Sequence, residues 1–185
     1  LSLVRVVGSE GAMADVPGHD LTYQAEAGLV RSTALPPSLF ADMAGALMAS
    51  EAVLQAILIS RRTGRGILRE VGLAQAATWL ALPWHWGLTQ PSGDVGGAHA
   101  GYRIYPCKDG IVAVAALEPH FALRLCEAAG IPLTENAPTS ASAVTDLLRA
   151  PATHAHIAVF VRTQTRAALE ALATAHDIPL HTLPP

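Results

Sequence analysis

Apolar positions in this chain occur with two periods, which predicts a mixture of strands and helices. Mostly apolar runs at Leu3–Val7, with Arg5 within it, and at residues 66–73, with Arg69 and Glu70 within it, predict two short strands. Apolar residues at spacings of three and four predict helices, the last of which should end at Pro83. The helices predicted in this half of the chain cover residues 21–30, 42–61 and 74–82. This order of elements is typical of an α/β fold.

The longest predicted helix, over residues 42–61, carries one apolar stripe. Such a stripe is the face that an amphipathic helix usually turns to the core. Its members are Met43, Leu47, Leu54 and Leu58. Ser50, Glu51 and Gln55 interrupt the apolar sequence, so no run reaches the ~18 apolar residues that a membrane span needs. We therefore expect no membrane partner.

The second half of the chain predicts one β-hairpin followed only by helices. Runs at residues 101–105 and 111–116 flank an Asp109-Gly110 turn, which is a strong hairpin signal. Pro119 suits the first turn of the next helix. The helices predicted here cover residues 121–129, 143–149, 154–161 and 167–176, the last with Thr163 or Thr165 as its cap.

Composition indicates that the chain should not bury its apolar surface alone. Of its 185 residues 51% are hydrophobic and 15% charged, against ~25% charged in typical globular domains. Such a surface predicts a subunit interface. The net charge of −3, without a basic block, argues against nucleic acid as a partner. Cys107 and Cys126 show neither metal nor disulfide spacing, so we expect reduced thiols in a cytoplasmic protein without a secretory signal.

Three residues stand where predicted elements begin or end and could carry chemistry. Asp42 lies at a helix start, where an aspartate is favoured as a cap but could also serve as nucleophile or base. His19 lies in a Gly-His-Asp turn and is either an ordinary loop histidine or a general base. Glu118 follows the second hairpin strand and is either a first-turn glutamate or a functional residue. Asp20 is expected to cap the short helix that follows it rather than to catalyse.

Other polar and aromatic residues carry weaker signals. His154 and His156 form a His-x-His pair, but positions two apart do not share a helix face, so no metal site is expected. The paired glycines Gly96-Gly97 are of a kind common in loops. The three tryptophans could line an acyl pocket, although clustered tryptophans more often lie in a core or an interface. They are Trp79, Trp84 and Trp86.

In their order along the chain, several of these stretches resemble the class III CoA-transferase family, of the L-carnitine dehydratase and bile-acid-inducible protein F type. The resemblance rests on a Gly-His-Asp box, a central aspartate box, the turn after the long helix, the paired glycines and a Leu-Glu-Pro box. These are residues 17–24, 41–45, 63–66, 96–97 and 117–121. With further similar stretches at residues 3–7, 102–105, 109–110 and 162–163, the resemblance covers nearly the whole chain and is strongest to the α-methylacyl-CoA racemase branch.

The resemblance implies a fold. The family has a Rossmann-like large domain, a smaller α+β domain with a β-hairpin, and two chains interlocked as a dimer. On that pattern residues 1–35 are a fragment of the large CoA-binding domain, residues 36–100 form a central helix and linker region, and residues 101–185 form the small domain, with Pro36-Pro37 as a boundary between lobes. Because the family's first large-domain segment has no counterpart here and Leu1 opens directly into a strand, we expect a fragment of a larger homodimeric protein.

The resemblance also implies roles for single residues. In the racemase branch the positions matching His19 and Asp42 exchange the α-proton of an acyl-CoA as an acid/base pair, and the position matching Glu118 supports the histidine. In the transferase branch the position matching Asp42 is a nucleophile that forms an aspartyl-CoA thioester. Coenzyme A enters as part of the substrate, with no prosthetic group and no metal. The residues expected to contact it are Gly18, Gly45, Gly96 and Gly97. A further alternative is an inactive fragment that only binds a partner subunit or CoA.

Overall fold

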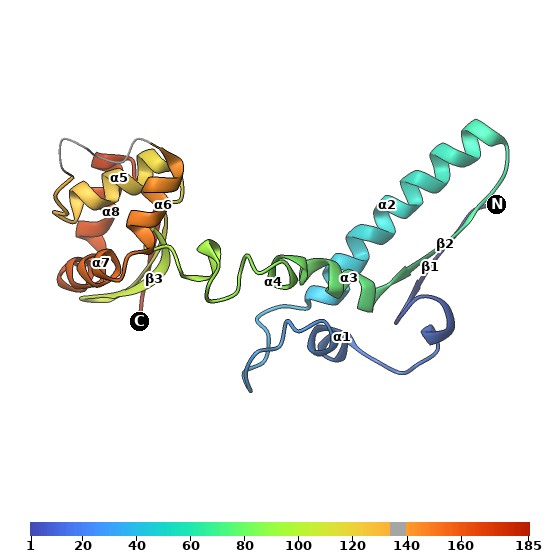
Figure 1. Cartoon of the computed structure of the whole chain (residues 1–185). Helices are drawn as coiled ribbons and strands as arrows, with labels where there is room; N and C mark the ends of the chain where they lie inside the picture. The colour runs from blue at the N-terminus through green and yellow to red at the C-terminus, as the bar shows by residue number, and fades with distance from the viewer. Residues whose placement is uncertain (134–139) are drawn as a thin grey trace. The chain divides into compact units, whose positions relative to one another are not determined.

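The computed structural model describes residues 1–133 and 140–185, and the chain separates into two compact units. These are Leu1–His85 and Trp86–Pro185 (Figure 1). Pro36 and Pro37 lie inside the first unit, in the connection between its first two α-helices, and not at the boundary between the compact units. The three-part division expected for the parent fold stays a prediction.

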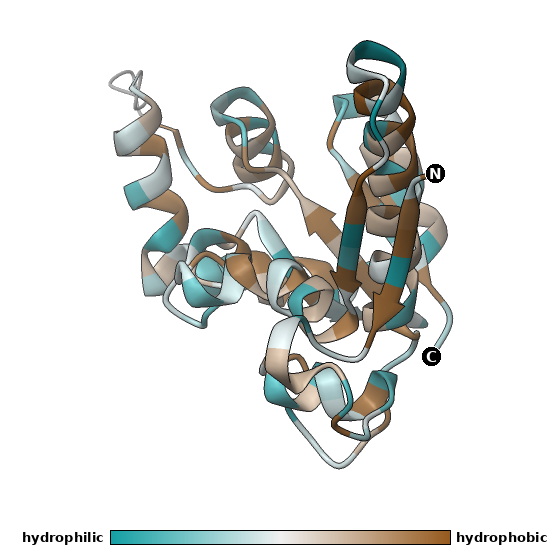
Figure 2. Ribbon diagram, turned by 90° about the vertical axis from the view of Figure 1, so that its right-hand side faces the viewer, coloured by the Kyte–Doolittle hydropathy of each residue, from teal (hydrophilic) through white to brown (hydrophobic). Residues whose placement is uncertain are grey.

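The first unit is built around a parallel pair of strands on which a long helix packs. β1 (Leu3–Val7) pairs with β2 (Leu68–Gly72), as the two apolar runs predicted. In Figure 2 both strands are brown, that is apolar, toward their ends and carry a teal, hydrophilic segment in the middle. The long helix α2 (Phe40–Thr63) lies between them in the chain and packs on both. The other helices of this unit are a 3-10 turn (Gly11–Met13), α1 (Asp20–Glu26), α3 (Leu73–Leu80) and α4 (Leu82–His85).

The apolar stripe that should face the core on α2 is exposed, because a row of small residues packs instead. Met43, Leu47, Leu54 and Leu58 keep between 59% and 74% of their surface exposed. The buried residues are Ala41, Ala44, Gly45, Ala52 and Ala56. Their small size lets α3 come so close that a Cβ on Gly45 would lie 2.3 Å from Cδ2 of Leu73. Both sides of α2 are apolar, so the size of the side chains, and not their polarity, separates the two faces.

The length and composition of α2 bear on the question of a membrane. In the part of the chain that the structure describes, α2 is the helix long and apolar enough to cross a membrane by these two criteria. A helix that packs on another protein surface meets the same criteria. The expectation of no membrane partner therefore stays a prediction.

The ends of the helices in the first unit follow their glycines and prolines with one exception. Gly64 ends α2 in the left-handed conformation, with φ of 69°, which is the usual role of a glycine there. Pro83 does not end α3, which stops at Leu80, but lies within the short helix α4. A first-turn position leaves the backbone N–H without a helical partner, so a proline is tolerated there.

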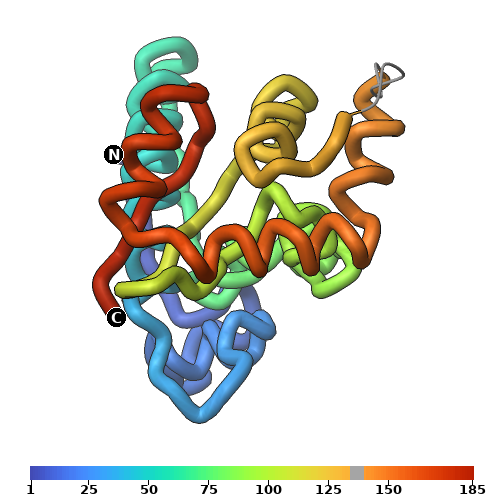
Figure 3. The backbone as a smooth tube through the Cα atoms, turned by 90° about the vertical axis from the view of Figure 1, so that its left-hand side faces the viewer, coloured from blue at the N-terminus to red at the C-terminus, as the bar shows by residue number. Residues whose placement is uncertain are grey.

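In its described residues, 86–133 and 140–185, the second unit is a three-stranded antiparallel sheet with four α-helices. β3 (Tyr102–Cys107) and β4 (Gly110–Ala115) form the predicted hairpin, in which Cys107 pairs with Gly110. A third strand, β5 (Leu180–Leu183), pairs with β4 and was not predicted, since a continuous helical pattern was expected after residue 139. A 3-10 turn (Asp94–Gly96) precedes the sheet. Figure 3 follows the helices in chain order, which are α5 (Pro119–Ala128), α6 (Ala141–Arg149), α7 (Pro151–Thr163) and α8 (Arg166–His176).

The core of the second unit lies between the inner face of this sheet and its helices. Tyr105, Val112 and Val114 point inward from β3 and β4, where alternate residues share one face. Burial of each large aliphatic side chain contributes about 1.5–3 kcal/mol. The helices supply fully buried Leu125, Leu148, Ile157 and Leu169. Thr165, one of the two threonines expected as a cap, accepts a hydrogen bond from the backbone of Ala168 at the start of α8.

Candidate functional site

Asp20 joins the start of α1 to the start of α2. One carboxylate oxygen, Oδ1, accepts hydrogen bonds from the backbone nitrogens of Ala41 at 2.8 Å and Asp42 at 3.1 Å. The other oxygen accepts from the side chain of Gln24. Asp20 therefore caps α2, which has no side-chain cap of its own. The sequence had predicted that Asp20 caps α1, and that prediction is wrong. The N-cap of α1 is His19.

This connection brings two of the three predicted chemical residues into one region. His19 immediately precedes Asp20 in the chain, and the backbone of Asp42 is bonded to the Asp20 carboxylate. Both side chains are exposed. Thr22 fixes the backbone of His19 from both sides, since its hydroxyl accepts from the His19 nitrogen at 3.0 Å and donates to the His19 carbonyl at 2.7 Å. An imidazole and a carboxylate thus stand at two adjoining helix starts, open to a ligand.

The buried side-chain amide of Gln24 stabilises the same connection between the starts of α1 and α2. The side chain of Gln24 is fully buried, and its Nε2 donates both to Asp20 and to the carbonyl of Ser38, at 3.1 Å for the latter. Ser38 lies in the connection that leads into α2. The cap of α2 and the path of the chain into α2 therefore depend on one small network, in which Nε2 of Gln24 is paired twice and its buried Oε1 has no hydrogen-bond partner.

The two glycines predicted in this unit allow close packing within it. A Cβ on Gly18 would lie 2.6 Å from the hydroxyl oxygen of Tyr23, and one on Gly45 would meet Leu73. Both positions are next to the predicted catalytic residues in the chain. The local structure thus explains why these residues are small, and their expected contact with coenzyme A stays a prediction.

A groove on the first unit is lined by Phe40 and Met43, which stand on either side of Asp42 in the chain, but not by Asp42 itself. It has a volume of about 460 Å³ and is mostly apolar, with Glu51 as its acidic residue. Trp79, one of the three tryptophans suggested for an acyl pocket, lines it, whereas Trp84 carries the guanidinium of Arg31 at 3.3 Å from its ring centre. The lining residues are Phe40, Met43, Ala44, Leu47, Met48, Glu51, Trp79 and Leu80.

The third predicted catalytic residue, Glu118, belongs to the second unit. It is the N-cap residue of α5, directly after the strand β4, and its exposed side chain makes no capping hydrogen bond. Its neighbour His120 contacts the ring of Phe121, with 3.8 Å between the ring centres. An approach of Glu118 to His19 stays a prediction.

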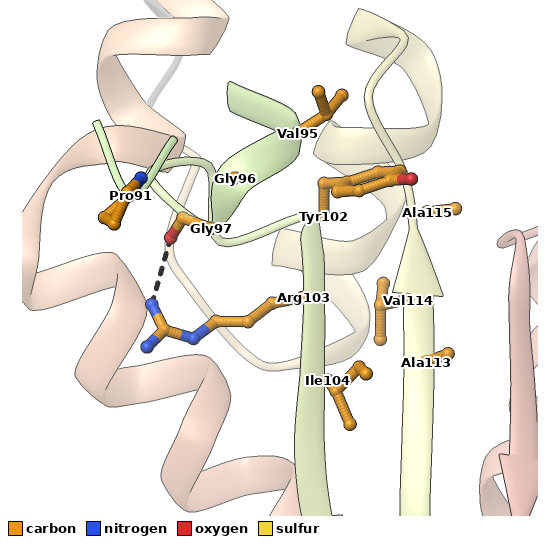
Figure 4. A pocket seen from close by; sticks show the side chains of 10 residues that line it. All are labelled: Pro91, Val95, Gly96, Gly97, Tyr102, Arg103, Ile104, Ala113, Val114 and Ala115. Atoms are coloured by element: carbon orange, nitrogen blue, oxygen red, sulfur yellow. Dashed lines mark hydrogen bonds between the residues drawn. The ribbon is translucent and has the colours of Figure 1, made fainter. Parts of the chain in front are cut away.

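Gly96 and Gly97 lie in a turn, which we name the glycine loop (residues 94–98). The turn is tight, because a Cβ on Gly96 would lie 1.7 Å from the carbonyl oxygen of Gln90, and Gly97 has a φ of 106°. The loop borders a depression of about 600 Å³ on the outer side of β3 and β4, and Nη1 of Arg103 donates to the carbonyl of Gly97 at 3.0 Å (Figure 4).

Histidines that the sequence left without a role hold backbone groups in this unit. His154 binds the carbonyl of Ala98 and His156 that of Ala129, both at 2.9 Å. His99, which the sequence analysis missed, is buried, accepts from the nitrogen of Gly101 at 3.1 Å, and has a pKa lowered by burial. Its Gly-Gly-Ala-His context gives no signal of that burial. Across residues 1–133 and 140–185, no three His, Cys, Asp or Glu residues are arranged to hold a metal ion.

Comparison with known families decides the membership of the chain. The model of CoA-transferase family III matches residues 3–183. The chain belongs to CoA-transferase family III. As a member of this family it is expected among proteins that act on CoA thioesters, and the match does not separate the racemase branch from the transferase branch. No curated protein matches the chain.

Solved structures show the fold of this family III chain. A hypothetical protein of Mycobacterium tuberculosis, Rv3272, is 19% identical with a TM-score of 0.75, and the match covers 97% of this chain and 52% of that one. A CAIB/BAIF family protein from Brucella suis is 20% identical with a TM-score of 0.66, again over 97% and 52% of the two chains. The chain therefore has an α/β fold that spans about half the length of these structures.

Proposed function

We propose that this family III chain carries the acid/base residues of an acyl-CoA enzyme that exchanges the α-proton of its substrate, as an α-methylacyl-CoA racemase does. The observation that carries the proposal is the cap from Asp20 to α2, which joins the turn of His19 to the helix start of Asp42. The match to a family that acts on CoA thioesters supports the substrate class. The exposure of both side chains leaves them open to such a substrate.

Racemisation sets a geometric demand that two such residues can meet. One base removes the α-proton, the electron pair of the C–H bond moves into the thioester carbonyl to give an enolate, and a second group returns a proton on the opposite face. His19 and Asp42 take these two roles, in an order that depends on the enantiomer. Glu118 orients the imidazole of His19 and raises its basicity.

The rest of the proposal concerns binding and assembly. Backbone at Gly18, Gly45, Gly96 and Gly97 contacts the coenzyme A part of the substrate, because glycine lets a ligand approach the main chain. The protein works as a cytoplasmic homodimer whose chains interlock. The exposed apolar stripe of α2 supports an assembly larger than one copy of the chain, since large apolar surfaces are seldom left in water.

CoA transfer is the second candidate, and the position of Asp42 favours it. An exposed carboxylate in the first turn of a 24-residue helix is suited to attack a thioester carbonyl. The acyl group passes to the Asp42 oxygen as coenzyme A leaves as a thiolate, and attack of that thiolate on the Asp42 carbonyl then releases the acyl carboxylate and leaves an aspartyl-CoA thioester. The third candidate is an inactive piece that only binds a partner subunit or CoA.

Two measurements, α-proton exchange and hydroxylamine trapping, together separate the three candidate functions. The chain, and the chain extended to the length of its relatives, are incubated with a 2-methylacyl-CoA in deuterated water, and deuterium at the α-carbon is measured. His19→Ala and Asp42→Ala should each slow the exchange at least ~10²-fold, the usual contribution of a general acid/base group. The control is Asp15→Ala, an exposed aspartate of the same unit.

The outcomes are distinct. Unchanged exchange in the Asp42→Ala variant would remove the racemase proposal. No exchange, together with a hydroxylamine-trapped Asp42 after addition of acyl-CoA, would establish the transferase. If the extended protein shows neither exchange nor trapping, the third candidate, a piece that only binds a partner subunit or CoA, is supported.

A further inference from the structure

We propose that Arg103 and His154 are positioning residues that hold the glycine loop in its bound-ready shape, and that they do so only while His154 is neutral. The proposal rests on the proposed function, because it concerns the loop whose Gly96 and Gly97 are assigned to coenzyme A. Arg103 and His154, and a dependence of the loop's shape on pH, are not required by any other part of the proposed function.

The loop is held through two successive carbonyl groups. Nη1 of Arg103 donates to the carbonyl of Gly97 at 3.0 Å, and Nε2 of His154 lies 2.9 Å from the carbonyl of Ala98. The two side chains also touch each other, with 3.2 Å between Arg103 Nη1 and His154 Nδ1. Arg103 comes from β3 and His154 from α7, so two rigid elements of the second unit converge on the loop.

A third anchor holds the beginning of the same loop. Nε of Arg149, at the end of α6, lies 2.7 Å from Oδ1 of Asp94. Both side chains are partly exposed, so this ion pair alone contributes little. With Gly97 and Ala98 held at the other end, the loop is fixed at both of its ends.

The contact between Arg103 and His154 determines which nitrogen of the imidazole carries the proton. A guanidinium has only donors, so Nδ1 of His154 must accept, and Nε2 must then carry the hydrogen that goes to Ala98. Both bonds exist together only in the neutral ring. Protonation of Nδ1 would place an N–H against the Arg103 guanidinium and break that contact.

Two arginines and one aspartate lie around His154. Arg103 from β3 and Arg149 from α6 line the same shallow depression as His154, and Asp94, which pairs with Arg149, is the nearby acid. His99 of the adjoining segment also interacts with His154. Arg103 and Arg149 are both positively charged, and the carboxylate of Asp94 is already paired with Arg149. Among these neighbours, a protonated His154 would therefore find no free negative charge. In acid, Arg103 should therefore turn away and release the loop.

Amide hydrogen exchange on the chain without ligand tests the positioning directly. The nitrogens of Gly96 and Ala98 both donate to the carbonyl of Gly93, so their exchange rates report whether the loop keeps its shape. His154→Phe should speed exchange at both amides roughly tenfold, the scale of one or two lost hydrogen bonds, while amides of β4 stay unchanged. His156→Phe is the matched control, because it removes an equivalent bond on the same helix to the distant Ala129.

The pH dependence is a readout that a merely structural residue would not give. After correction for intrinsic rates, the unsubstituted chain should show faster loop exchange in acid than at neutral pH, and the His154→Phe variant should lose this change. If His154→Phe does not fold, Arg103→Met serves instead, since it removes Nη1, the nitrogen that contacts both Gly97 and His154. Equal exchange in the natural chain and in either folded variant overturns the proposal.

Coenzyme A affinity, measured by calorimetry on the same variants, separates this proposal from the proposed function. A loosened loop with weakened CoA binding supports both. A loosened loop with unchanged CoA binding supports the positioning role and overturns the assignment of Gly96 and Gly97 to coenzyme A.

Discussion

The carboxylate of Asp20 lies 3.1 Å from the backbone nitrogen of Asp42, so a residue of α1 caps the helix that carries the proposed nucleophile or base. Because this cap comes from another helix, it does more than provide an acceptor for the first backbone N–H groups of α2, which have no partner within the helix. It ties the position of the Asp42 backbone to the turn that carries His19. The relative position of the two catalytic candidates therefore depends on a residue that contacts neither reacting atom.

Removal of this cap should destabilise the first unit. Asp20→Ala leaves the nitrogens of Ala41 and Asp42 without their side-chain acceptor and removes one of the two acceptors of the buried Gln24 amide, which should cost about 2–3 kcal/mol of unfolding free energy. Asp20→Asn keeps one acceptor oxygen and should lose about half as much. Urea unfolding followed by tryptophan fluorescence measures both, with Asp15→Ala as the control. An equally stable Asp20→Ala variant would show that the junction is held by other contacts.

The two faces of α2 should respond oppositely to substitution. Leu54→Gln changes an exposed side chain and should alter the unfolding free energy of the chain by no more than about 0.5 kcal/mol. Ala56→Leu overfills the buried face and should cost about 1–3 kcal/mol. Leu54→Gln should also reduce any self-association seen by light scattering. A large loss of stability in the Leu54→Gln monomer would mean that the stripe is the packed face after all.

Glu118 should act through charge if it orients His19. Glu118→Gln keeps a hydrogen-bonding side chain but removes the negative charge, so α-proton exchange should fall less than in His19→Ala and the basic side of its pH profile should shift. The measurement is the pH dependence of deuterium incorporation by the extended protein. An experimental structure of the assembled protein with Glu118 in bulk solvent, remote from every copy of His19, would make it an ordinary helix-start residue.

The two cysteines should differ sharply in reactivity. Burial raises the pKa of Cys126 to about 11, so at about pH 8 its thiol is both protonated and inaccessible, whereas Cys107 is only half-buried. A disulfide reagent should modify one thiol in the native chain and two in denaturant. Because the unfolded thiol ionises at lower pH than the folded one, stability should fall as the pH rises above about 9. Rapid modification of Cys126 in the native chain would contradict this burial.

Much of the fold follows from the sequence because local signals and packing agree there. The apolar run Leu3–Val7, the Asp109-Gly110 turn and the glycine after α2 each mark an element that the structure contains. β5 escaped prediction because it has four residues and adjoins prolines, and only its pairing with β4 makes it a strand. The packed face of α2 was assigned wrongly, since periodicity cannot tell which of two apolar faces meets a neighbour.

For the candidate site, the sequence predicted that three residues stand at the starts of elements, but not how these residues are connected. His19, Asp42 and Glu118 stand at element starts, as their turn and strand contexts indicated. The role of Asp20 could not be read from the sequence, because an aspartate near one helix start gives no sign that it caps another helix more than 20 residues away. The same holds for His154, whose partner carbonyl at Ala98 lies 56 positions earlier in the chain.

The pairing of β1 with β2 has a consequence for how the chain folds as it is made. The two strands come from segments about 65 positions apart, and a parallel pair gains nothing until the whole connection between them has formed. During synthesis the pair of β1 and β2 can therefore form only after β2 has left the ribosome. The second unit gains part of its contacts from a local hairpin. We expect the first unit to be the slower of the two and the one that depends more on chaperones.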